Sequence, residues 1–483
     1  MVQTMAFITI PRPLSLLASS TKDSWSSASV HCSYSKKSSR FSTNSKGLNR
    51  DCKTIFWNVG SFRRQYLSQL TAMLMTFKDD GRDGSEAKYD PESFSKLLFQ
   101  VPISEMKFLS KLAFLCNIAY VILKIEGIYL RRYYGLYLIA SSLETKTEAT
   151  SSTKAKLEEF GSEKAMGFER KHHRIHSPKD QLLSMAAHQS FHSSPFEWII
   201  CDDPIRHTRI FVIQGPDSLT SWWRVLFFHP TKFEGKLDVF VHRGMYEAAK
   251  VIYEKVIPHV VDFLQTHGEQ ARFQFTGHSL GGSIAVLVSL MLLIRNVVRC
   301  SMVEPVVTFG SPFVLCGGRK LLDELKLDDA QIYNVIMHRD IVPRGFSCNI
   351  PGFHISVLKL FKRSLHSHTC LNENKFMYSP LGNLLILQPN AKSSPGHPLL
   401  PPGTAFYALD TTGYKDTSNA AINGFLNSPH PLQTLFDPKA YGDDGTVSLN
   451  HDSSSYLKAI NGVLRLHITA TIVPKLREKK SLL

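Results

Sequence analysis

A five-residue run near the middle of the chain, GHSLG at positions 277–281, constrains the fold more than any other feature. Glycines on either side of a serine are typical of a sharp turn from a strand into a helix that exposes the serine hydroxyl. Such a short pattern also arises by chance, so its context decides. Residues 272–276 predict a strand before it, and the strongly apolar residues 280–297 predict a helix after it. We therefore predict that Ser279 is a nucleophile at a helix N-terminus, where free N–H groups favour a developing oxyanion.

From residue 181 onward, short apolar stretches alternate with helical ones, which is typical of an α/β fold. The last two strands flank a proline-rich turn, 395–402, and predict an antiparallel hairpin. The expected strands are 209–214, 272–276, 305–309, 331–337, 383–388 and 404–409, and the expected helices are 245–267 and 280–297. We predict a central mixed, mostly parallel sheet in a domain spanning residues 181–475.

A serine hydroxyl is a poor nucleophile until a base takes its proton, so a histidine oriented by a carboxylate must accompany it. Serine hydrolases built on such a sheet keep the order serine, acid, histidine. Asp340 comes just after the predicted strand 331–337, and ligand and catalytic groups gather at the carboxyl ends of such strands. We predict that Asp340 is the acid, the alternative being a salt bridge with Arg339 or Arg344.

Seven histidines follow Asp340, and sequence physics alone barely ranks them. His451 directly precedes a helical stretch, on a loop that can reach back toward the serine. His467 lies within a β-branched stretch, where packing or surface pairing explains it better. These positions favour His451 over His467, and local sequence alone leaves the choice of base open.

The first fifty residues have the composition of an organelle transit peptide. They carry thirteen serines and seven basic residues against one acid, and no compact apolar region stands before a small-residue cleavage site. We expect plastid targeting for 1–50, with a mitochondrial signal or a disordered tail as alternatives. Of the formal net charge of +15, this segment holds +6. The remainder suits weak, salt-sensitive attraction to an anionic lipid surface, and no motif supports nucleic-acid binding.

Two regions stand between this segment and the main domain. Apolar positions recur at three and four residues across 91–140 and predict an N-terminal helical region packed on the main domain. A membrane-surface role is its alternative, favoured by the Tyr/Arg run 129–134. No apolar run there reaches the roughly 18 residues of a transmembrane helix. Residues 141–180, rich in Ser, Thr, Lys and Glu without apolar periodicity, predict a flexible charged linker.

No metal or organic cofactor is expected. The eight cysteines are spread out without a Cys-x-x-Cys pair, so the sequence indicates neither a zinc site nor a disulfide framework. Three linker histidines, His172, His173 and His176, invite a metal hypothesis. No cysteine or carboxylate pair stands at ligand spacing around them, and a solvated basic loop explains them.

Three motifs in order give the chain a family resemblance. They are Gly-His-Ser-Leu-Gly-Gly at 277–282, Thr-Phe-Gly-Ser-Pro at 308–312 and His-Arg-Asp-Ile-Val-Pro at 338–343. Together they resemble the class 3 lipases, and over roughly residues 91–475 the chain is similar to plant plastid lipases that act as phospholipase A1. The resemblance implies an α/β-hydrolase fold with an N-terminal helical extension.

By this resemblance Ser279 is the nucleophile and Asp340 the acid. The family's base lies in a His-x-x-x-x-Tyr-Leu neighbourhood, which matches His451. By the resemblance His451 is therefore the predicted base, and His467 is the second choice. Residues 221–230, dense in Trp and Phe, correspond to the lid that covers the site in water and opens on lipid; the alternative is that these aromatic residues are simply core.

The oxyanion hole departs from the family pattern. The N–H of Leu280 matches one donor, and the second donor should follow the pair Gln214-Gly215. Pro216 stands there, with neither an N–H nor a hydroxyl. We expect the N–H of Asp217, or Ser218, to take over. The alternative is a slow or inactive enzyme, since loss of one such donor can cost about 10²–10³ in turnover.

The resemblance implies an acylhydrolase that releases fatty acids from the sn-1 position of polar glycerolipids. Expected substrates are phosphatidylglycerol, phosphatidylcholine and galactolipids, met by peripheral contact with the thylakoid or envelope membrane. A triacylglycerol lipase is one alternative, disfavoured because a basic surface suits anionic headgroups better. A catalytically silent lipase-fold scaffold is the other, and Pro216 is its support.

Overall fold

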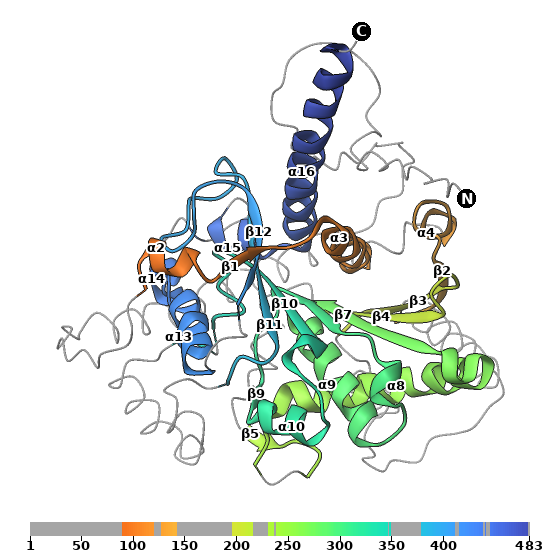
Figure 1. The fold of residues 1–483 in the computed structure, drawn as a ribbon. Coiled ribbons are helices and arrows are strands. Elements are labelled where there is room, and N and C mark those ends of the chain that lie inside the picture. The colour runs from red at the N-terminus through yellow and green to blue at the C-terminus, as the bar shows by residue number, and fades with distance from the viewer. Residues whose placement is uncertain are drawn as a thin grey trace, which may run out of the picture. The chain divides into compact units, whose positions relative to one another are not determined.

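A nine-stranded sheet runs through the centre of the computed structural model, in the order β1-β12-β11-β10-β8-β7-β4-β3-β2 (Figure 1). The structure describes residues 89–119, 127–142, 196–215, 230–235, 238–345, 347–348, 378–410, 415–437, 440 and 445–481. The strands are β1 (Leu98–Gln100), β2 (Tyr137–Ser141), β3 (Trp198–Asp203), β4 (Thr208–Gln214), β7 (Arg272–His278), β8 (Val306–Phe309), β10 (Ile332–Met337), β11 (Asn383–Gln388) and β12 (Ala405–Leu409).

The five central strands, from β4 to β11, are parallel, and the outer strands on each side pair antiparallel. Every residue of β4 is buried, as expected for a parallel strand covered on both faces. In the β4–β7 pairing Phe211 lies opposite Phe275, and their rings stack with centroids 4.8 Å apart. The predicted mixed, mostly parallel sheet is confirmed.

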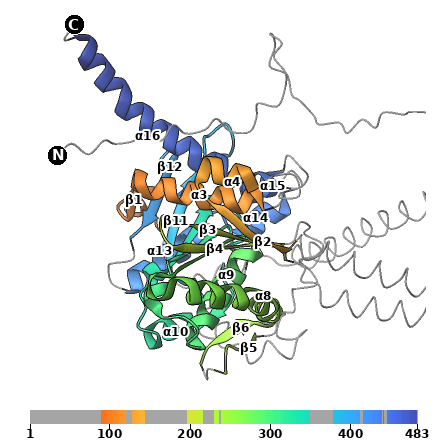
Figure 2. The same ribbon diagram turned by 90° about the vertical axis from the view of Figure 1, so that its right-hand side faces the viewer.

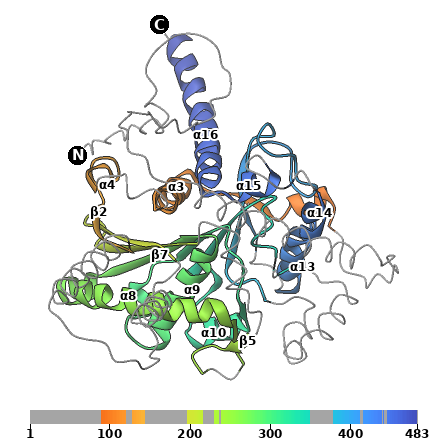
Figure 3. The same cartoon turned by 180° about the vertical axis from the view of Figure 1, so that it is seen from behind.

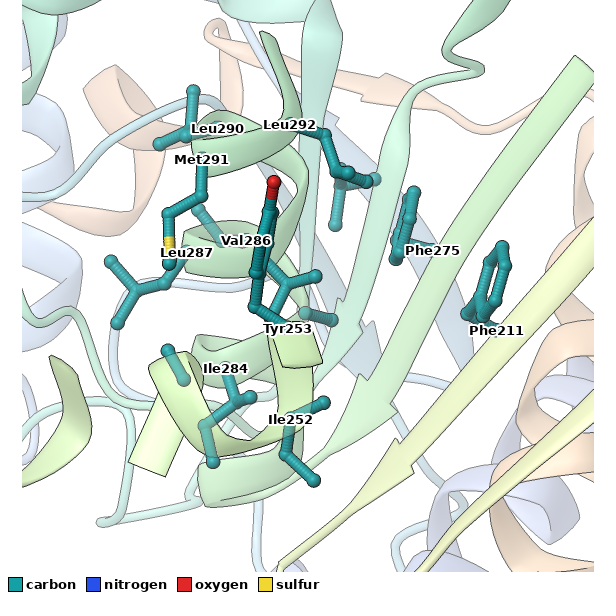
Figure 4. Close-up of a cluster of buried hydrophobic side chains, with 14 of the residues drawn as sticks. Phe211, Ile252, Tyr253, Phe275, Ile284, Val286, Leu287, Leu290, Met291 and Leu292 are labelled. Atoms are coloured by element: carbon teal, nitrogen blue, oxygen red, sulfur yellow. The ribbon is translucent and has the colours of Figure 1, made fainter. Parts of the chain in front are cut away.

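Helices α8 (Arg243–His267) and α9 (Leu280–Ile294) cover one face of this sheet. All residues of α9 except Ile294 are buried, because the helix lies between the sheet and other chain segments and is apolar all round. Figure 4 shows Ile284 of α9 near Ile252 of α8, with Phe211 and Phe275 on the sheet side.

Helices α3 (Ile103–Ile118) and α16 (Ser453–Ser481) cover the opposite face and lie side by side (Figures 1 and 3). Two hydrogen bonds join them: Ser110 Oγ to Asn461 Oδ1 at 2.8 Å, and Ser453 Oγ to Asn117 Oδ1 at 3.1 Å. The N-terminal region thus fixes the start of α16. Figure 2 shows α4 (Gly127–Tyr134) near α3, on the same side of the sheet.

A third apolar cluster and a small second sheet accompany the nine-stranded sheet. A third apolar cluster joins α2 and α13 to the β11–β12 end of the sheet, and β5, β6 and β9 form a separate three-stranded sheet. The bounds of the remaining elements are α2 (Pro91–Ser95), α10 (Gly318–Glu324), α13 (Lys415–Leu426), α14 (Pro431–Phe436), α15 (Thr446–His451), β5 (Pro230–Lys232), β6 (Phe240–His242) and β9 (Leu315–Cys316), with 3-10 turns at Gly268–Gln270, Cys300–Met302 and Asp329–Gln331.

All six expected strands of the main domain and both expected helices are present, with bounds shifted by a few residues. The expectation of helices alone across 91–140 was wrong at two places. β1 pairs with β12 and β2 pairs with β3, so this region also supplies strands to the main sheet. β1 has three residues and β2 has five, and the strands they pair with are distant in sequence. The prediction therefore followed the helical periodicity of the neighbouring residues.

Two other expectations concern membranes and cysteines. No helix in the described part of the chain is long and apolar enough to cross a membrane. The sequence does not indicate a disulfide framework, and Cys316 is nevertheless disulfide-bonded. The 1–50 segment and residues 143–180 of the predicted linker lie outside the described residues, as do its three histidines.

Candidate active site

The nucleophile candidate Ser279 stands at the turn between β7 and α9, as the sequence predicted. Its backbone has φ 57° and ψ −136°, a conformation that costs a side-chain-bearing residue energy and is frequent at functional sites. A Cβ added to Gly277 would lie 2.5 Å from the carbonyl oxygen of Ile213, and one added to Gly281 would collide with the same oxygen. The two glycines therefore let the turn press against β4.

The structure brings the three predicted residues into one chain of hydrogen bonds. Nε2 of His451 lies 2.9 Å from Oγ of Ser279, and Nδ1 of His451 lies 2.9 Å from Oδ2 of Asp340. The side chain of Asp340 is fully buried, and that of His451 is 14% exposed. This arrangement lets the histidine take the serine proton while the carboxylate holds the imidazole in one tautomer.

Two donors besides His451 fix the Asp340 carboxylate. The N–H of Val342 donates to Oδ1 at 2.9 Å, and the Tyr456 hydroxyl donates to Oδ2 at 2.7 Å. The same hydroxyl accepts from the N–H of Met337 at 2.9 Å. Burial, and next the nearby Asp340 charge, raise the pKa of Tyr456 well above its usual value, so it stays a donor to the carboxylate. Tyr456 thus links the end of β10 to α16 at the acid.

Gly310 leaves room for this arrangement. It has φ +60°, and an added Cβ would lie 2.7 Å from Oδ2 of Asp340, 2.9 Å from the Tyr456 hydroxyl and 3.2 Å from Nδ1 of His451. A larger residue there would collide with three members of the site at once.

His278 supports the base from beneath. Its ring lies 4.9 Å from that of His451, centroid to centroid, and its Nε2 is 2.7 Å from the His451 carbonyl oxygen. Burial, with a smaller contribution from the neighbouring His451, lowers the pKa of His278 to about 3. His278 is therefore neutral at physiological pH and donates to that carbonyl, which anchors the backbone of the base.

His451 ends α15, directly before α16, rather than on a loop as the sequence suggested. Its neighbour Asn450 is buried and accepts from Ser394 Oγ at 3.0 Å. His467, the second choice for the base, lies in α16, fourteen residues beyond its first residue Ser453. At 1.5 Å per residue that is about 20 Å along the helix axis, so His467 is not near Ser279.

The predicted oxyanion donors are described only in part. Leu280 is the first residue of α9, and N–H groups of a first helical turn have no partner within the helix. A Cβ added to Gly215 would lie 3.1 Å from Cβ of Ser279 and 3.3 Å from the Leu280 nitrogen. The chain therefore passes the nucleophile just before Pro216. Pro216, Asp217, Ser218 and 221–229 of the predicted lid lie outside the described residues.

Three residues of the site were missed or given no role from sequence. Tyr456 was part of the neighbourhood that matched the family's base, but no contact was assigned to it. Gly310 lies inside the second family motif, and His278 inside the first. Their contacts are with Asp340 and His451, far along the chain, and no local pattern reveals them. Within the described ranges no cluster of side chains could hold a metal ion.

Comparison with known proteins places these observations in a family. The sequence model of the class 3 lipases matches residues 210–350. The chloroplastic phospholipase A1 PLIP1 of Arabidopsis thaliana is 47% identical over a 443-residue alignment that covers 80% of this chain and 67% of that protein. The chloroplastic phospholipase A1 PLIP2 of the same plant is 40% identical over 481 residues, covering 84% and 67%.

Solved structures of fungal lipases also match. The Lip2 lipase of Yarrowia lipolytica is 17% identical with a TM-score of 0.43, covering 74% of this chain and 96% of that one. The native propeptide complex of Rhizomucor miehei lipase is 15% identical with a TM-score of 0.43, covering 78% and 90%.

Proposed function

This chain belongs to the class 3 lipase family, and on that premise we propose that it is a phospholipase A1 that uses Ser279, His451 and Asp340 to release fatty acids from polar glycerolipids. The observation that carries the proposal is the hydrogen-bonded chain from Ser279 through His451 to a fully buried Asp340, at the strained turn that begins α9.

In the first half of the reaction, Ser279 Oγ attacks the ester carbonyl carbon while Nε2 of His451 takes its proton. Asp340 stabilises the imidazolium that forms, and the N–H of Leu280 donates to the oxyanion. Collapse of the tetrahedral intermediate breaks the bond to the glycerol oxygen. His451 protonates that oxygen, and a lysolipid leaves.

The acyl group then remains on Ser279 until water removes it. His451 accepts a proton from the water as it attacks the acyl carbon, and returns it to Ser279 as the fatty acid departs. Asp217 or Ser218 supplies the second oxyanion donor that Pro216 lacks. This sequence of steps needs no metal or organic cofactor.

The substrate assignment rests on the relatives. The two Arabidopsis proteins are named phospholipase A1, which implies cleavage at the sn-1 position. We assign phosphatidylglycerol, phosphatidylcholine and galactolipids as the substrate class. Both relatives are also named chloroplastic, and with the basic, serine-rich 1–50 segment this supports a plastid location. Contact with thylakoid or envelope membranes would be peripheral.

The test is acyl release by purified protein from phosphatidylglycerol, phosphatidylcholine, monogalactosyldiacylglycerol and triolein, beside Ser279→Ala. We expect free fatty acid and sn-1 lysolipid from the polar lipids, and none from the variant. A serine-reactive fluorophosphonate should label the wild type only. Equal labelling of Ser279→Ala would exclude Ser279 as the nucleophile, and preference for triolein would replace the phospholipase with a triacylglycerol lipase.

The silent-scaffold alternative makes a different prediction. If Pro216 disables the oxyanion hole, the wild type releases no fatty acid and Pro216→Ser restores the activity. Activity in the wild type that Pro216→Ser raises by less than about tenfold would show that another donor serves in place of residue 216.

A further inference from the structure

A cavity lies beneath the loop that joins β11 to β12. Its volume is about 170 Å³, enough for several water molecules or one small organic group. It stands at the carboxyl ends of β10 and β11, the sheet edge that also carries Asp340. Three of the side chains lining it, His338, Gln388 and His397, are polar and at least 95% buried.

Each of these side chains has one polar atom without a hydrogen-bond partner among the described residues. His338 Nε2 is 2.9 Å from the carbonyl oxygen of Pro395, so Nε2 carries the proton and Nδ1 is an acceptor. Burial lowers the pKa of His338 to about 4, which keeps the ring neutral. The Gln388 amide nitrogen donates to the carbonyl oxygens of Pro401 and Gly403, which leaves Oε1 as a second acceptor.

His397 carries a hydrogen-bond donor rather than an acceptor. Its Nδ1 accepts from the N–H of Leu399 at 3.1 Å, so the proton of the neutral ring is on Nε2, a donor. Burial lowers the pKa of His397 to about 2, and the ring therefore stays uncharged. The cavity wall thus offers the Gln388 acceptor and two neutral imidazoles, whose rings also interact with the backbone carbonyl oxygens of Leu387 and Ser428.

The surrounding charge selects among ligands. Among the residues that the structure describes, none that lines the cavity is acidic. The Arg339 guanidinium binds the carbonyl oxygens of Pro395 and Gly396 on its wall, and the Arg344 charge also acts on His397. An ammonium group would be repelled by these cations, and a phosphate would face the Gln388 acceptor. A hydroxyl group both donates and accepts, and adjacent hydroxyls match this wall best.

We propose that this cavity binds the adjacent hydroxyl groups of a neutral polyol. The inference deepens the proposed function and rests on it in one respect: the polyol is taken to be the hydroxylated headgroup of a lipid substrate, such as glycerol or a sugar. A free polyol has the same chemistry and is the other source to be distinguished.

A hydrogen bond connects the cavity to the catalytic base. Ser394 lines the cavity, and its hydroxyl donates to Oδ1 of Asn450, the residue before His451. Asn450 in turn donates to the Thr446 carbonyl oxygen at 2.8 Å within α15. A headgroup held in the cavity would therefore lie against the β11–β12 loop, which is hydrogen-bonded to the residue before His451.

The first experiment measures free-polyol binding to the Ser279→Ala protein by ligand-observed NMR, with glycerol and galactose as probes. In that background Gln388→Met removes the acceptor and keeps a side chain of similar size. Gln274→Met is the matched control, because Gln274 is also buried and also donates to two carbonyl oxygens, of Phe275 and Pro305. We expect a saturation-transfer signal that Gln388→Met loses and Gln274→Met retains.

The second experiment compares hydrolysis of phosphatidylglycerol with that of phosphatidylmethanol, which has the same charge but no headgroup hydroxyl. We expect kcat/KM to favour phosphatidylglycerol about tenfold in the wild type and in Gln274→Met, the effect of one or two hydrogen bonds. In Gln388→Met the kcat/KM values for the two lipids should become equal, because the value for phosphatidylglycerol falls to that for phosphatidylmethanol.

The combined results distinguish a lipid headgroup from a free polyol as the occupant of the cavity. A polyol signal together with headgroup preference supports the headgroup. A signal without preference supports a free polyol as the occupant. Absence of both, or a Gln388→Met variant that slows both lipids equally and leaves the NMR signal unchanged, overturns the proposal. A protein that hydrolyses no lipid contradicts the proposed function, and the NMR experiment still decides the cavity.

If Gln388→Met does not fold, Gly396→Val replaces it in both experiments. Gly396 lines the cavity, and a Cβ added there meets no atom within 4 Å. The added side chain should narrow the cavity and abolish the polyol signal, whereas an unchanged signal would overturn the proposal.

Discussion

The two halves of the candidate active site are built in different ways. The serine half, β7 and the start of α9, is fixed by its own backbone and by two glycines that press against β4. The histidine half depends on side chains from distant segments: Tyr456 of α16 on Asp340, His278 beneath His451, and α3 against α16. Substitution of a glycine in the serine turn should therefore abolish the site, whereas removal of one hydrogen bond in the histidine half should reduce activity only in part.

The largest effect is expected in the serine half, from Gly281→Ala. The new Cβ would collide with the carbonyl oxygen of Ile213, which belongs to a fully buried strand. We expect hydrolysis to fall below detection and the free energy of unfolding to drop by about 3 kcal/mol. Denaturant titration and fatty-acid release measure the two effects.

Gly462→Ala is its control, because a Cβ added to Gly462 in α16 meets nothing within 4 Å. It should leave activity unchanged and raise stability by up to about 1 kcal/mol. A Gly281→Ala enzyme with normal activity would refute the view that this turn is pressed against β4.

Gly310→Ala tests the contact between the halves. Its Cβ would approach Asp340, Tyr456 and His451 together, at a backbone φ of +60° that disfavours alanine. We expect kcat to fall about 10²-fold as the acid and base separate, with a stability loss of about 1–2 kcal/mol. Retained fluorophosphonate labelling at a reduced rate would show that Ser279 itself is still in place. An unchanged kcat would contradict the crowding described at this glycine.

Tyr456→Phe tests a single hydrogen bond in the histidine half. It removes the donor to Asp340 and leaves the Met337 N–H without its acceptor. We expect kcat to fall about tenfold and the free energy of unfolding to drop by about 1–2 kcal/mol. The pH profile of kcat should also shift, whereas a purely structural role would leave the profile in place and change stability alone.

The smallest effect is a pH dependence of stability that comes from His278. Its pKa is about 3 in the folded protein and about 6.5 in an unfolded chain, so between these values the unfolded state binds more protons. The free energy of unfolding should therefore fall with decreasing pH, by about 1 kcal/mol per pH unit from this histidine. Denaturant titrations at pH 6.5, 5.5 and 4.5 should give a shallower slope for His278→Phe, and equal slopes would contradict the buried neutral histidine.

The same contrast explains what the sequence could predict. The serine turn and the strand before Asp340 are local patterns, so both were found. His451 was selected through family resemblance, because seven histidines differ little in local sequence. The hydrogen bond of Tyr456 to Asp340 and the approach of Gly310 to Tyr456 and His451 join residues more than a hundred positions apart, and no periodicity encodes them. The second oxyanion donor, Asp217 or Ser218, stays a prediction.

The two edge strands give the N-terminal region a further consequence. β1 and β2 both come from residues 98–141, and each closes one edge of the nine-stranded sheet. The partner of β1 is β12, which ends at Leu409. During synthesis, β1 leaves the ribosome some three hundred residues before its partner, and an unpaired edge invites aggregation. Completion of the sheet must therefore wait until most of the chain has been made.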